Sequence, residues 1–133
     1  MIGTVVDQEL TIGEAFEMLS RELRVKIRDD ERMLNGRIFT PNGWTISVGF
    51  GSYHYCSNRQ MSPFMSPMPF KEAIKGDDCE IAIFDPNDDW FVPHGGDQVW
   101  GYVSTQTLLK VVDAVALYRE GGPCPCPDCV GER

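Results

Sequence analysis

The sequence predicts an α+β domain in which an N-terminal and a C-terminal helix pack on an antiparallel meander sheet. Two observations carry this prediction. Helical periodicity occurs near both ends of the chain, and short strands separated by turn residues fill the stretch between them. Strands joined by short turns pair antiparallel, which leaves the two helices to cover the sheet. We therefore expect a single domain over residues 1–120, followed by a Cys/Pro-rich tail over residues 121–133.

Both helices carry terminal signals. The first is expected over residues 11–24, because Thr11 and Glu14 have the spacing of a capping box ahead of an apolar stripe. The last is expected over residues 105–119, with Ser104 as a helix cap and two glycines after it. Apolar residues cover more than one face of this last helix, which indicates that it is largely buried.

The clearest strand signal flanks Pro41-Asn42-Gly43. This tripeptide predicts a tight hairpin turn, because proline presets φ and Asn-Gly accepts positive φ. Alternation over residues 44–50 predicts a strand with one buried face. Further strands are expected over 79–84 and 98–103. The stretch 25–34 is consistent either with a continued helix or with a short strand and a turn.

The charge is acidic and uneven. The net charge is −8, with 7 basic and 8 acidic side chains in residues 1–60 but 5 and 12 in residues 61–133. Such a balance repels phosphate backbones, so direct nucleic-acid binding is not expected, whereas the acidic half suits docking on a basic protein surface. Neither a membrane span nor a secretory signal is visible. We expect a cytoplasmic protein away from membranes, and a homo-oligomer is compatible with the sequence.

Three of the five cysteines, Cys124, Cys126 and Cys129, lie together in the tail. They supply three soft ligands, and zinc prefers four in a tetrahedron. Zinc would fix a Pro/Gly-rich segment that has no core of its own. The alternative is a disordered C-terminus without metal. The candidates for the fourth ligand are a residue of another chain, Cys56, Cys79, His54 and His94.

Residues 53–59, YHYCSNR, indicate a possible small-molecule site. Tyrosine rings stack on planar ligands, and Asn and Arg side chains bind phosphate or carboxylate groups. An ordinary edge strand with aromatic packing would explain the same residues. If the site exists, a nucleotide-derived ligand is expected to contact Tyr53, Tyr55, Asn58, Arg59 and Trp90.

The pair His54 and Cys56 also permits a Cys/His hydrolase. Residues two apart on a strand face the same way, and a histidine beside a thiol lowers the pKa of the thiol. The sequence shows no third orienting group and no oxyanion donor, so we expect a protein that is not an enzyme.

The loop 61–70, MSPFMSPMPF, is apolar and rich in proline. It covers the core or offers an adaptable surface to a protein partner.

The acidic turn 85–89 resembles the start of a calcium loop, but the glycine and glutamate positions do not match, so we expect a surface turn. The predicted partner surface consists of Phe64, Met65, Met68, Phe70, Asp88 and Asp89.

Four segments in order, NGWTISVGFG, YCSN, CEIAIFD and VWGYVSTQTLLKVVDAV, resemble small accessory proteins of tailed phages and prophages. The resemblance covers about residues 35–116, and its motifs are structural, so it brings no active site with it. It implies a non-enzymatic protein in a bacterial cytoplasm that binds and neutralises a host defence factor. The alternatives are a sponge for a nucleotide-derived signal, a small zinc-stabilised interaction module, and the Cys/His hydrolase.

Overall fold

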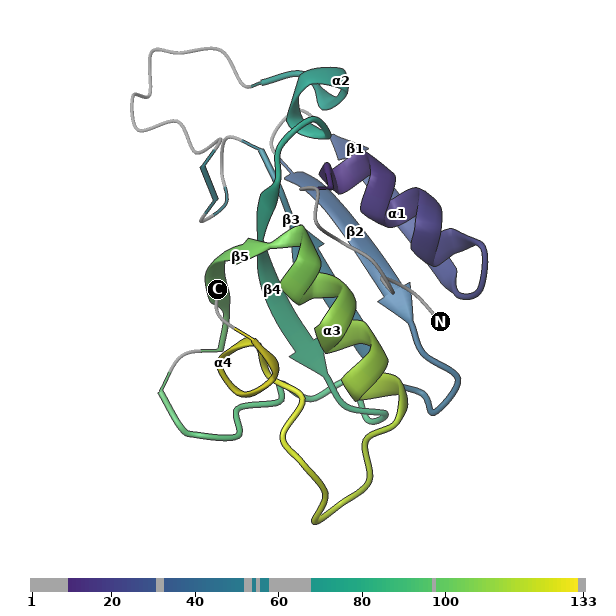
Figure 1. The fold of residues 1–133 in the computed structure, drawn as a ribbon, viewed down its shortest axis with the longest axis vertical. Helices are drawn as coiled ribbons and strands as arrows, with labels where there is room; N and C mark the ends of the chain where they lie inside the picture. The colour runs from purple at the N-terminus through teal and green to yellow at the C-terminus, as the bar shows by residue number, and fades with distance from the viewer. Residues whose placement is uncertain are drawn as a thin grey trace.

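The structure, a computed structural model, describes residues 10–30, 33–51, 54, 56–57, 68–96 and 98–131 (Figure 1). None of the helices in these ranges is long and apolar enough to cross a membrane. The elements follow one another as α1 (Ile12–Ser20), β1 (Arg24–Asp30), β2 (Met33–Phe39), β3 (Thr45–Gly49), α2 (Phe70–Ala73), β4 (Asp78–Phe84), β5 (Trp100–Ser104), α3 (Thr105–Ala116) and α4 (Pro127–Val130).

The five strands form one antiparallel sheet in the order β1-β2-β3-β4-β5, so each strand pairs with the next one along the chain. The predicted antiparallel meander is confirmed. The hairpin turn before β3 is also present, with Gly43 at a φ of 89°. Asn42 in that turn donates from Nδ2 to the carbonyl of Val115 at 2.8 Å, which ties the hairpin to the end of α3.

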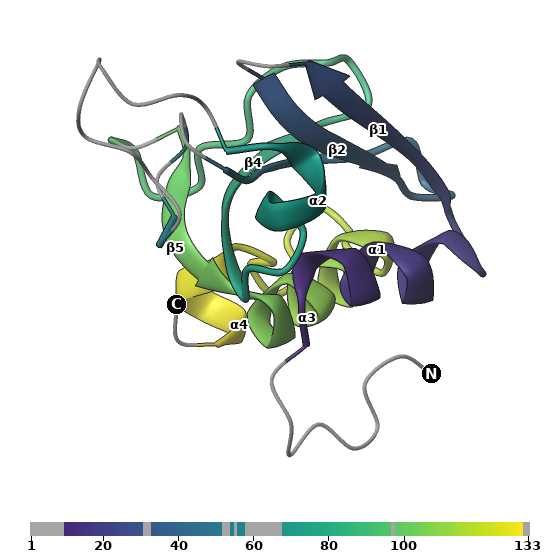
Figure 2. The same ribbon diagram turned by 90° about the horizontal axis from the view of Figure 1, so that it is seen from above.

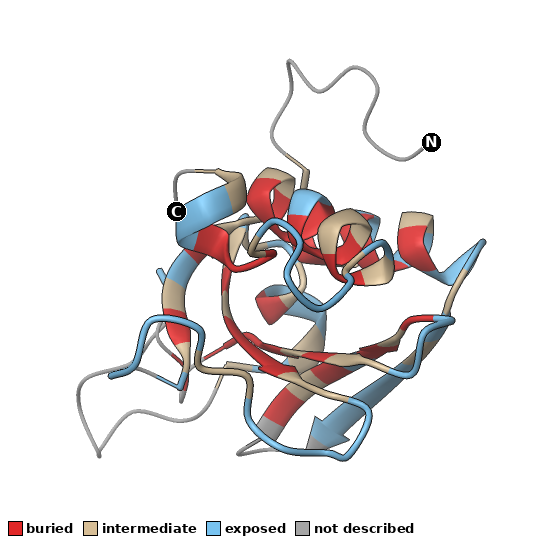
Figure 3. Ribbon diagram, turned by 90° about the horizontal axis from the view of Figure 1, so that it is seen from below, coloured by how far each residue is buried: buried red, intermediate tan, exposed pale blue. Residues whose placement is uncertain are grey.

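The helices α1, α3 and α4 lie on one side of the sheet (Figure 2). The buried residues of the two layers face each other in between (Figure 3). Sheet residues such as Ile38, Ile46 and Ile81 meet Leu19 of α1 and Leu108 of α3 there, all of them fully buried. In the described part of the chain no helix covers the opposite face of the sheet, which we call the open face.

The ambiguous stretch 25–34 forms β1 and the start of β2, and the first helix ends at Ser20 instead of residue 24. The alternation of Val25 and Ile27 with Lys26 and Arg28 is compatible with a strand, and pairing of the whole segment with β2 decides the conformation. The last helix ends at Ala116 instead of residue 119, because Tyr118 leaves the helix and packs against Trp44 with ring centroids 5.2 Å apart.

The capping box of α1 gives a test of the helix start. The backbone N–H of Glu14 donates to Thr11 Oγ1 at 3.1 Å, and the N–H of Thr11 donates to Glu14 Oε1 at 3.0 Å. These bonds lower the pKa of the Glu14 carboxyl. We expect Thr11→Ala to lower the free energy of unfolding by about 1 kcal/mol, because one helix N–H loses its acceptor. Urea unfolding measures the loss, and Thr11→Ser, which keeps the hydroxyl, should retain most of the stability.

Candidate metal centre

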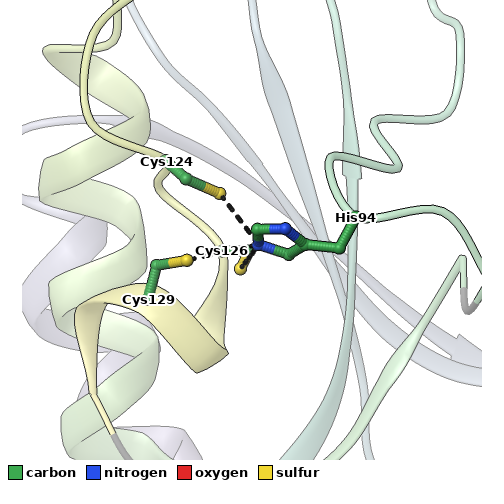
Figure 4. A group of neighbouring side chains, drawn as sticks. All are labelled: His94, Cys124, Cys126 and Cys129. Atoms are coloured by element: carbon green, nitrogen blue, oxygen red, sulfur yellow. Dashed lines mark hydrogen bonds between the residues drawn. The ribbon is translucent and has the colours of Figure 1, made fainter.

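His94, Cys124, Cys126 and Cys129 converge on one point between the loop after β4 and the C-terminal segment (Figure 4). Their ligand atoms all lie within 4.8 Å of one another. His94 Nε2 is 3.3 Å from Cys129 Sγ, 3.6 Å from Cys126 Sγ and 3.7 Å from Cys124 Sγ. The cluster thus joins two segments that are about thirty residues apart in the sequence.

These distances have the size expected around a tetrahedral zinc ion. With Zn–S near 2.3 Å and Zn–N near 2.05 Å, a tetrahedral angle places nitrogen and sulfur about 3.6 Å apart. Hydrogen bonding does not explain the arrangement, because a ring nitrogen carries either one hydrogen or one lone pair and cannot satisfy three sulfurs at once. The set of one imidazole and three thiols therefore fits a shared cation such as zinc.

The short helix α4 positions two of the sulfurs. Pro127 occupies its first turn, where the missing N–H is not needed. The N–H groups of Cys129 and Val130 donate to the carbonyl of Cys126 at 3.0 and 3.1 Å. This turn brings the sulfurs of Cys126 and Cys129 to the side of the segment that faces His94 (Figure 4). Cys126 is fully buried in the core, and α4 packs against α3, so the segment is anchored to the domain.

An aromatic cluster holds the two halves of the centre together. Phe91, three residues before His94, donates its N–H to the carbonyl of Ile83 at 2.8 Å. Its ring lies 5.3 Å from Trp44 and 5.7 Å from Tyr118, measured between centroids. Tyr118 begins the segment that leads to the cysteines. Contact between Phe91 and Tyr118 therefore brings the histidine loop and the cysteine segment to the same place.

Burial and the local backbone act in opposite directions on the thiols of the cluster. Burial raises the pKa of the Cys124 and Cys126 thiols. Backbone hydrogen bonds partly offset this rise in pKa: Asp128 and Cys129 act in this way on Cys126, and Cys126 acts in this way on Cys124. N–H groups aimed at sulfur stabilise a thiolate, the form that binds zinc. A cation entering the cluster displaces the thiol protons.

Of the candidates for the fourth ligand within this chain, His94 is the one that lies with the three cysteines. Cys79 is fully buried and donates from Sγ to the carbonyl of Val103 at 3.4 Å. Cys56, also buried, donates to the carbonyl of Gly51 at 3.2 Å. His54 Nδ1 lies 3.4 Å from Glu80 Oε1. The Cys56 thiol thus contacts a backbone carbonyl and the His54 ring contacts Glu80. These contacts are not the thiol–imidazole hydrogen bond that the hydrolase alternative needs.

The other predicted site residues are spread over the molecule or lie outside the described ranges. Trp90 is 46% exposed at the rim of the open face. Met68 and Phe70 pack against the core, whereas Asp88 and Asp89 are exposed in the turn after β4. The predicted residues outside the described ranges are Tyr53, Tyr55, Asn58, Arg59, Phe64 and Met65.

Comparison with known proteins returns no match: no family model, no curated protein and no solved structure is similar to this chain. The resemblance to phage accessory proteins therefore stays a prediction, and the candidate site rests on its geometry.

Proposed function

We propose that this chain is a small zinc-stabilised interaction module. In this proposal His94, Cys124, Cys126 and Cys129 bind one zinc ion, which fixes the C-terminal segment against the domain. The observation that carries the proposal is the convergence of these four ligand atoms within 4.8 Å from two separate segments. Three cysteines and one histidine are among the ligand sets that structural zinc sites use.

The ligand number favours a structural role for the ion. Catalytic zinc sites keep one position open for water or substrate, whereas four protein ligands fill the tetrahedron. An interaction module of this kind acts by binding a partner molecule. The phage-type role, in which the protein neutralises a host factor through protein–protein contact, is compatible with such a module and is our proposal for its biological setting.

The first test is the metal content of the intact protein, purified without chelator. We expect native mass spectrometry to show one zinc per chain, lost on treatment with a strong chelator. The same spectrum reports the number of subunits. Hydrogen exchange should then show faster exchange in residues 119–131 and in the loop 91–96 after chelation, while the strands of the sheet stay protected.

A chain that carries no zinc and takes none up on addition of the ion would refute the proposal. Zinc bound with no change of exchange in residues 119–131 would place the ion elsewhere and would also contradict it.

A further inference from the structure

The open face of the sheet carries a second candidate site, away from the four cysteine and histidine ligands. A hollow of about 560 Å³ lies over the strands β1 to β4. This volume falls within the range of small-molecule sites, about 300–1,000 Å³. The residues that line it include Lys26, Arg28, Arg37, His54, Glu80 and Trp90.

Cations are concentrated on this face. Lys26 and Arg37 are direct partners across β1 and β2, and Arg28 is paired with Asn35. Like charges directly opposite each other on a sheet are destabilising. Arg24 continues the row, with its guanidinium 4.9 Å from the centre of the Phe39 ring. A chain with a net charge of −8 thus places four of its 12 basic residues on one face of two adjacent strands. An anionic ligand would place a counter-charge beside Lys26 and Arg37, while the one carboxylate among the lining residues, Glu80, lies next to His54.

The floor of the hollow carries polar side chains beside Gly49 and Ala82. Asn35 donates from Nδ2 to Ser47 Oγ at 2.8 Å, which orients both side chains on the open face. The His54 ring lies directly on Gly49, where an added Cβ would come within 2.3 Å of Nδ1. His54 is 7% exposed, and in the described part of the chain its Nε2 has no hydrogen-bond partner. A buried polar atom without a partner is destabilising, so this nitrogen is available as a donor or acceptor at the floor of the hollow.

One rim of the hollow is aromatic. Trp90 and Phe84 form a tilted pair with ring centroids 4.6 Å apart, and a backbone bridge between the two residues fixes the pair at the end of β4. Nearly half of the Trp90 surface stays exposed. An exposed, anchored indole ring is a platform on which a planar ring stacks.

We infer that the open face binds a small anionic compound that carries a planar ring, of the mononucleotide class. Lys26, Arg28 and Arg37 contact the phosphate, Trp90 stacks on the base, and the polar floor contacts the groups between them. Of the residues that the sequence suggests for a nucleotide ligand, Trp90 lies within the described ranges, and it lines this hollow. The inference is independent of the proposed zinc ion, because none of the four metal ligands lines the hollow.

Isothermal titration calorimetry with AMP and with GMP tests the inference. We expect saturable binding of at least one of them. Adenosine and guanosine lack the phosphate, and inorganic phosphate lacks the base and the sugar, so each of these should bind at least about 10-fold more weakly. Arg37→Ala should weaken binding by about 10-fold or more through the lost charge-assisted hydrogen bonds. Trp90→Ala should weaken it about 5-fold or more through the lost stacking.

The matched control is Arg21→Ala, an exposed arginine on the helical side that pairs with Glu17, and its affinity should equal that of the wild type. All these side chains are exposed, so the variants should fold, which circular dichroism verifies. Absence of saturable heat at millimolar AMP and GMP overturns the inference. Equal affinity for nucleotide and nucleoside, or affinity unchanged in both Arg37→Ala and Trp90→Ala, also overturns it.

Discussion

Cys129→Ser is expected to release zinc and to lower the melting temperature by about 10 °C. The hydroxyl of serine is a poor zinc ligand, and a loss of about 100-fold in zinc affinity corresponds to about 2.7 kcal/mol of stability at saturating metal. For a chain of this size each kcal/mol shifts the melting temperature by about 4 °C. Cys129 is exposed, so the substitution removes a ligand without opening a cavity in the core.

Differential scanning fluorimetry with and without chelator, combined with zinc analysis of the same samples, measures both effects. The control is Cys79→Ser, which alters a fully buried thiol outside the cluster. It should lower the melting temperature while one zinc per chain remains bound. A Cys129→Ser protein that keeps its zinc and its melting temperature would contradict the assignment of Cys129 as a ligand.

Phe50→Ala is expected to lower the free energy of unfolding by about 3–5 kcal/mol, the usual loss for a buried phenylalanine. Phe50 is fully buried after the end of β3. Its ring centroid lies 5.6 Å from that of Phe16 in α1 and 6.0 Å from that of Phe70 in α2. The substitution therefore leaves a cavity where two helices meet the sheet.

Urea unfolding of Phe50→Ala beside Phe39→Ala tests this expectation. Phe39 is half-buried on the open face, under the guanidinium of Arg24, and its loss should cost clearly less. Equal losses in the two variants would show that Phe50 does not hold the helices to the sheet in the way its contacts indicate.

Much of the fold could be predicted because its signals are local. The capping box of Thr11 and Glu14 and the turn at Pro41-Asn42-Gly43 specify their own backbone conformations. β1 could not be assigned, because the alternation of Val25 and Ile27 with charged residues is short and follows a helix directly. Pairing with β2 decides that conformation, and pairing is a contact between segments.

The metal centre also depends on a contact between distant segments, which the sequence alone does not reveal. The three cysteines are close in sequence, so their convergence is visible in the spacing alone. His94 lies 30 residues before Cys124, and it reaches the cluster because Phe91 packs against Tyr118.

The basic residues of the open face could not be grouped from the sequence for a related reason. Lys26 and Arg37 become neighbours only through the register of β1 and β2, and the alternating charges of β1 were the signal that would have suggested it.

The order of the strands has a consequence for the path by which the chain folds. β1, β2 and β3 pair through short connections, whereas β3 pairs with β4 across the long segment from residue 50 to residue 77, so closing that longer loop costs more chain entropy. If the C-terminal segment docks after the sheet has formed, we expect the proposed zinc ion to slow unfolding and to leave the folding rate nearly unchanged.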